Sequence, residues 1–94
     1  MTNLELTNKF IDNNKLDFSG SGSDLNGTCV ILAGYICYLV DEDDLDRGNG
    51  EDIINVLSIP TDAKKELLRV FEFAYYGNYD KFWKTQQAKD EYVF

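Results

Sequence analysis

The chain has 94 residues, of which 44% are hydrophobic and 28% are charged, and its formal net charge is −8. This length predicts one domain with a single core, and the hydrophobic content excludes an intrinsically disordered chain. The chain contains no histidine. That excludes a Ser-His or Cys-His catalytic pair and an HExxH zinc site, and two cysteines alone cannot complete an ordinary zinc site.

The first predicted element is a helix from about residue 3 to residue 14. Thr2 and Glu5 stand before it at the spacing of a capping box, in which each side chain bonds the backbone of the other residue. Phe10 is expected on its inner face. A flexible loop rich in serine and glycine follows at residues 19–22.

The stretch CVILAGYICYLV, residues 29–40, is the most apolar part of the chain, and Gly34 is its only residue that is not apolar. We predict a central helix over about residues 24–40, opened by Ser23 or Asp24 as the N-cap. A buried strand is the alternative, but a run of this length favours a helix. Twelve apolar residues are fewer than the roughly 20 that a membrane span requires.

Cys29 and Cys37 lie eight residues apart in that stretch. On a helix this spacing separates them by about 12 Å, which is too far for a disulfide. We therefore expect two reduced, buried cysteines, as is typical of a cytoplasmic protein. The first long apolar run begins only at Cys29 and no basic region precedes it, so no secretory signal is predicted.

Residues 41–52 are strongly acidic, with seven acids and one base, and Gly48-Asn49-Gly50 predicts a turn inside them. We expect this segment to be a solvated acidic loop. An EF-hand calcium loop is not predicted, because Leu45 or Asn55 falls where the motif requires a ligand. The acids of the segment are Asp41, Glu42, Asp43, Asp44, Asp46, Glu51 and Asp52.

The second half of the chain predicts further helices. A short one is expected to begin near Glu51 and to stop at Pro60, which cannot continue a helix. Thr61 is predicted to cap a clear amphipathic helix that ends at Gly77, a left-handed C′ residue. Asn78 is predicted to cap a last helix that carries Tyr79, Phe82 and Trp83, and Thr85 restarts a turn that runs to Tyr92.

These elements predict a mainly α fold, a small bundle of four to five helices around the central helix. Residues 1–94 are expected to form a single globular domain, since no repeat and no linker separates them. Phe71, Phe82 and Trp83 are expected in its core.

The chain offers little chemistry for catalysis. Asp43 and Asp44 are paired carboxylates, but nothing in a solvated loop separates their pKa values as an acid–base pair requires. Residues 19–28 resemble a phosphate loop in glycine spacing only, because Thr28 and Cys29 replace its Lys and Ser/Thr. We predict no enzymatic activity, no metal and no cofactor.

Two binding functions remain. The acidic segment favours docking of a basic, nucleic-acid-handling protein, because complementary charge speeds encounter, although such a segment can also serve only to keep a protein soluble. Direct binding to nucleic acid is disfavoured because the bases form no stripe, and no membrane contact is predicted. The alternative is a structural or adaptor subunit that binds through the aromatic C-terminal third at Tyr75, Tyr76 and Tyr79. Such a subunit can form a homodimer.

In size, charge and absence of catalytic residues, the chain resembles the small acidic inhibitors that phages and mobile elements encode. These include nucleic-acid mimics of the anti-restriction and anti-CRISPR kind. The resemblance implies a cytoplasmic, stoichiometric inhibitor that blocks a basic, nucleic-acid-binding partner through its acidic surface.

Overall fold

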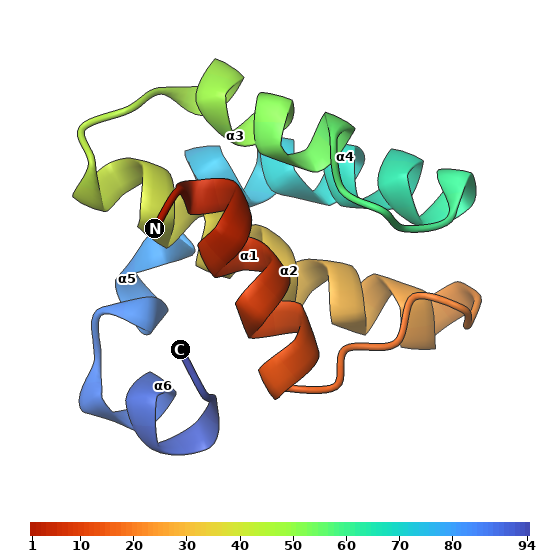
Figure 1. Ribbon diagram of the computed structural model, residues 1–94, viewed down its shortest axis with the longest axis horizontal. Coiled ribbons are helices and arrows are strands. Elements are labelled where there is room, and N and C mark those ends of the chain that lie inside the picture. Colours follow the sequence, from red (N-terminus) through yellow and green to blue (C-terminus); the bar gives the residue numbers. More distant parts are fainter.

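The computed structural model describes all 94 residues and contains six helices and no strand (Figure 1). The mainly helical fold is thus confirmed, with two helices of six residues or fewer near the C-terminus raising the count above the four to five expected. In chain order the helices are α1 (Asn3–Asn13), α2 (Gly22–Glu42), α3 (Arg47–Asn55), α4 (Thr61–Tyr76), α5 (Asp80–Trp83) and α6 (Gln86–Glu91).

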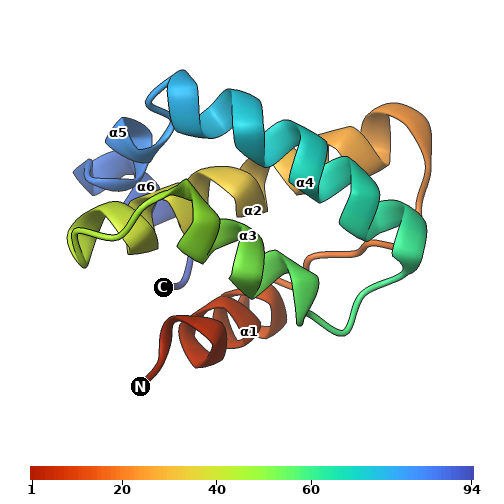
Figure 2. The same cartoon turned by 90° about the horizontal axis from the view of Figure 1, so that it is seen from above.

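The predicted central helix is α2, and it is longer than expected. It lies between α1 and α4, as Figure 2 shows, and it also packs against α3 and α5. The predicted caps, Ser23 and Asp24, are inside its first turn, because the helix begins at Gly22 with Ser21 at the N-cap. Gly22 has a φ of +60°, a value that favours glycine. Nine of its residues are buried: Cys29, Leu32, Ala33, Gly34, Tyr35, Ile36, Cys37, Leu39 and Val40.

The 21 residues of α2, with a mean hydropathy of 1.3 in their most apolar part, are long and apolar enough to cross a membrane. The length argument drawn from twelve apolar residues is therefore wrong. Half of that apolar part is buried within the protein. A helix that forms the core of a soluble protein meets the same criteria of length and composition.

The segment expected to be an acidic loop is mostly helical. Asp41 and Glu42 end α2, and α3 already begins at Arg47, so only residues 43–46 connect the two helices. Asp46 and Asn49 form a capping box: the Asp46 carboxylate accepts from the Asn49 backbone N–H at 3.3 Å, and the Asn49 amide oxygen accepts from the Asp46 N–H at 3.2 Å. The turn predicted at residues 48–50 is therefore wrong, because this cap starts a helix through them.

Several helix ends differ from the prediction. Pro60, not Thr61, occupies the N-cap of α4, and α3 ends at Asn55, well before the proline. Gly77 ends α4 with a φ of −86°, whereas Asn78 takes the left-handed conformation with a φ of 57°. Asparagine tolerates this region better than most residues. Asn78 is therefore not the cap of α5, whose N-cap is Tyr79.

The capping box of Thr2 and Glu5 is confirmed at the start of α1, and so is the restart at Thr85, whose hydroxyl accepts from the Ala88 N–H at 3.3 Å. Around α2 the core is largely aromatic. Phe10 of α1 stacks on Tyr35 of α2 with ring centroids 3.9 Å apart, and Trp83 of α5 meets both rings edge-on. This cluster joins the two ends of the chain to the central helix.

Candidate protein-docking surface

The acidic side chains gather where α2 ends and α3 begins. Asp41 and Glu42 are the last residues of α2, Asp43 is its C-cap, Asp44 lies in the connection and Asp46 is the N-cap of α3. All five are exposed. The structure thus brings these five together, while Glu51 and Asp52 lie further along α3.

The seven predicted site residues differ in how strongly they are neutralised. Asp41 pairs with Lys84, the C-cap residue of α5, at 2.5 Å, and the Asp43 carboxylate accepts from the Asn3 amide at 2.9 Å. Glu51 pairs with Arg47 at 3.2 Å. Three exposed acids form neither an ion pair nor a side-chain hydrogen bond, namely Glu42, Asp44 and Asp52.

The end of α2 is an unfavourable place for negative charge. The last carbonyl groups of a helix already carry a partial negative charge, so acids there lower stability and bases raise it. The last turn of α2 has no base, although it ends in Asp41 and Glu42 and is capped by Asp43. Lys84 is the one cation that contacts these acids, and the hydrogen bond to Asp41 raises the pKa of its ammonium group. Asp46, in contrast, lies at the N-terminus of α3, where a negative charge is favourable.

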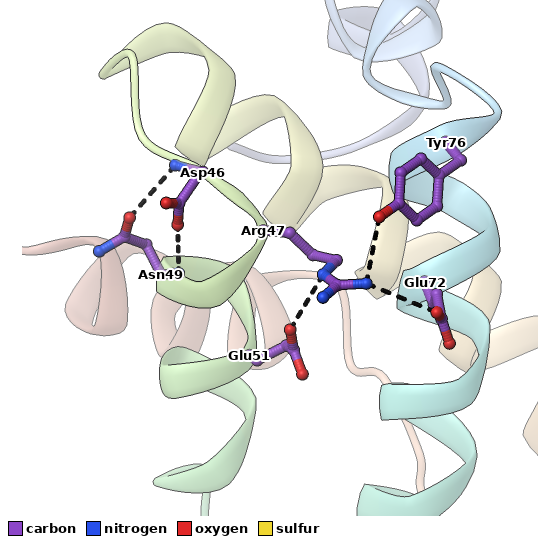
Figure 3. Close-up of polar contacts among 6 residues, drawn as sticks. All are labelled: Asp46, Arg47, Asn49, Glu51, Glu72 and Tyr76. Atoms are coloured by element: carbon purple, nitrogen blue, oxygen red, sulfur yellow. Dashed lines mark hydrogen bonds and ion pairs between the residues drawn. The ribbon is translucent and has the colours of Figure 1, made fainter.

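Figure 3 shows that the side chain of Arg47, the only base within residues 41–52, extends towards α4 and away from Asp46. Its guanidinium group pairs with Glu51 at 3.2 Å and with Glu72 of α4 at 3.5 Å. It also donates to the Tyr76 hydroxyl at 3.2 Å and lies 5.7 Å from the centre of that ring. Arg47 therefore joins α3 to α4, and Lys84 is left as the one base that contacts the acids at residues 41–46.

The three predicted tyrosines do not form one patch. Tyr75 is half-buried against Phe71, with ring centroids 6.2 Å apart. Tyr76 is 66% exposed on the outer face of α4, beside Phe73, which is 64% exposed. Phe73 was missed in the sequence, although it stands four residues after Arg69 and three before Tyr76, which is the spacing of one helix face. Tyr79 lies elsewhere, at a groove beside α5.

That groove is an apolar hollow of about 330 Å³ between α2 and α5. Phe82, expected in the core, is 38% exposed there, whereas Trp83 is buried as predicted. The residues around the hollow are Val30, Ile31, Gly34, Asn78, Tyr79, Phe82, Trp83 and Tyr92. A second, polar hollow of about 200 Å³ adjoins it at Asn78 and is lined also by Cys37, Asp41, Leu45, Tyr75 and Asp80.

The reactive groups of the chain are poorly placed for catalysis. Both cysteines are buried and free, and burial raises the pKa of Cys29 to about 11 and that of Cys37 to about 12. They are therefore protonated, weak nucleophiles at neutral pH. No three Cys, Asp or Glu side chains converge as metal ligands. The surface offers exposed charge and apolar hollows, which are means of binding.

Comparison of the chain with protein families, with curated proteins and with solved structures finds no match.

Proposed function

We propose that this protein is a non-enzymatic inhibitor that blocks a basic, nucleic-acid-handling protein through the acidic surface of residues 41–46. The observation that carries this proposal is the concentration of exposed acids at the C-terminal end of α2, where they oppose the helix dipole and where Lys84 alone offsets them. Natural proteins depart from such local rules mainly at functional sites. A basic partner would supply the missing cations.

The biological setting belongs to the same proposal. A small acidic protein that covers a nucleic-acid-binding surface acts by occupying it, as a counter-defence protein of a phage or mobile element does against restriction or CRISPR enzymes. Its two free cysteines suit the reducing cytoplasm, where we place it. Net charge of −8 favours fast encounter with such a partner at low salt.

The test compares two variants that lose the same charge at different places. In the first, Asp41, Asp43, Asp44 and Asp46 become Asn and Glu42 becomes Gln. Asp46→Asn keeps a good N-cap, so α3 is retained. The second, a control, neutralises five exposed acids elsewhere: Asp12, Asp24, Asp62, Asp90 and Glu91.

Both variants are titrated against the partner recovered by pull-down from host cells and identified by mass spectrometry. We expect the first variant to lose at least about tenfold in affinity, mainly through slower association, and the control to change little beyond the effect of net charge. Raising the salt concentration should lower the affinity of the native protein until it approaches that of the first variant. Salt screens exposed charges, which act over only about 8 Å at physiological ionic strength. Equal losses in both variants would leave residues 41–46 without a special role.

The second candidate function is an adaptor that binds through the outer face of α4. Its support is the exposure of Phe73 and Tyr76, each with a guanidinium group near its ring: Arg69 at 6.0 Å from Phe73, and Arg47 at 5.7 Å from Tyr76. Aromatic and arginine side chains are frequent in binding hot spots. Under this function, Phe73→Ala with Tyr76→Ala abolishes binding, while salt and the acidic variant have little effect.

A further inference from the structure

The apolar hollow beside α5 is open and already formed. Val30, Tyr79 and Phe82 are respectively 36%, 44% and 38% exposed around it. Its volume of about 330 Å³ is enough for one bulky side chain and lies within the range of ligand sites.

Gly34 and Trp83 keep the hollow in this shape. A Cβ on Gly34 would lie 2.4 Å from Nε1 of Trp83, so the indole can rest on α2 only because residue 34 is glycine. Trp83 is in turn held between Phe82 and Tyr92, with ring centroids at 5.2 and 4.9 Å. Walls fixed in this way lower the entropic cost of binding.

Two acids that line the neighbouring polar hollow already pair with a cation of the chain itself. Asp41 and Asp80 line it, and both carboxylates contact Nζ of Lys84, at 2.5 and 3.4 Å. Two carboxylates converging on one ammonium group define a place for a positive charge. Because Asn78 lines both hollows, this place adjoins the apolar one.

We infer that the two hollows together recognise a segment of the basic partner in which a bulky apolar side chain stands beside a lysine or arginine. The apolar side chain fills the hollow between α2 and α5, and the cation joins or displaces Lys84 at Asp41 and Asp80. The inference rests on the proposed function and adds to it where specificity arises: residues 42–46 attract the partner, and the paired hollows select it. The charge of the second hollow, complementary to a basic partner, is what identifies the occupant.

Small probes test the pair of hollows without the partner. Phenylalkylamines with two to six methylene groups are titrated into the protein, alongside phenylalkanols and phenylalkanoates of the same lengths. Trp83 is the only tryptophan, so its fluorescence reports occupancy of the apolar hollow. We expect the best amine to bind about fivefold more tightly than the matching alcohol, and the carboxylate to bind most weakly.

Variants separate the two halves of the site. Lys84→Gln should tighten amine binding about threefold and leave alcohol binding unchanged, because it frees both carboxylates. Asp41→Asn should weaken the amine alone. Tyr79→Ala should weaken amine and alcohol alike, whereas Val56→Ala, at an exposed apolar position after α3, is the control without effect. Equal binding of the amine, alcohol and carboxylate, or no change in Trp83 fluorescence, would overturn the inference.

Binding of the partner to the variants tests this inference separately from the proposed function. If binding needs the acids at residues 42–44 but is unchanged by Tyr79→Ala and Lys84→Gln, the proposed function stands and the paired hollows are not its recognition site. If the protein instead dimerises in sedimentation experiments and Tyr79→Ala abolishes the dimer, a second copy occupies the apolar hollow and the inference is wrong.

Discussion

The ring of Phe71 lies against the backbone of Gly50, so close that a Cβ at residue 50 would come within 2.2 Å of Phe71 Cζ. Both residues are buried, and Phe71 has no exposed surface. The contact joins α3 to α4 and lets the shorter helix approach the core. It also explains why a residue with poor helix propensity stands in the middle of α3.

Gly50→Ala is therefore expected to lower the free energy of unfolding by about 1–3 kcal/mol, the usual cost of overpacking a core. Alanine gains about 1 kcal/mol of helix propensity over glycine, but the displaced Phe71 ring outweighs it. The matched control is Gly27→Ala in α2, where no atom lies within 4 Å of the new Cβ, and it should stabilise by about 0.5–1 kcal/mol. Urea denaturation measures both, and stabilisation by Gly50→Ala would contradict the contact.

The core position of α2 predicts the cost of truncating its buried side chains. Leu32 and Ile36 are fully buried. Each change to Ala should lower the free energy of unfolding by about 2–5 kcal/mol, through lost burial and the cavity left behind. Val56→Ala, at an exposed position after α3, should change it by less than about 0.5 kcal/mol. Losses as small at residues 32 and 36 as at 56 would show that α2 is not the centre of the core.

The two ends of α2 should respond oppositely to the same change of charge. Glu42→Lys places a cation at the C-terminal end and should raise stability by about 0.3–1 kcal/mol at low salt. Asp24→Lys places one in the first turn and should lower it by a similar amount. Thermal melts in low and high salt check both, because screening reduces each effect. A gain at residue 42 would also show that its native charge is kept at the expense of stability.

The buried cysteines predict a loss of stability in alkali. The pKa of an unfolded cysteine thiol is about 9, whereas burial raises the pKa of Cys29 to about 11 and that of Cys37 to about 12. Between these values the folded state binds more protons than the unfolded state, so the free energy of unfolding falls as the pH rises. Urea denaturation at pH 7 and pH 10 measures this fall. The variant with both cysteines changed to Ala should show a smaller one, and an equal fall would assign it to other groups.

Local patterns in the sequence were sufficient for most of the helices. Thr2 and Glu5 predicted the start of α1, and the spacing of apolar residues predicted α2 and α4, because each signal is complete within a few turns. The start of α3 was missed because Gly48, Asn49 and Gly50 are typical of a turn. What makes them helical is the cap at Asp46 and the contact of Gly50 with Phe71, 21 residues away.

In the candidate site, too, the local features could be predicted from the sequence and the long-range contacts could not. The acids at residues 41–46 were visible in the sequence, because their charge needs no partner to be recognised. The paired hollows were not, since they form only where α2 meets α5, some fifty residues later in the chain. Phe82 looked like a core residue by type, but it lies on the single turn of α5 and is 38% exposed.

The contact between Asn14 and Val93 decides where an affinity tag can be attached. The Asn14 side chain donates to the Val93 carbonyl and accepts from its N–H, both at 2.8 Å. Phe94 follows directly and packs its ring against Tyr35 and Tyr38, with centroids 5.5 and 5.7 Å away. A tag fused after Phe94 would pull on this packed end beside the core. Met1 is exposed and stands ahead of the first helix, so binding experiments should immobilise the protein through it.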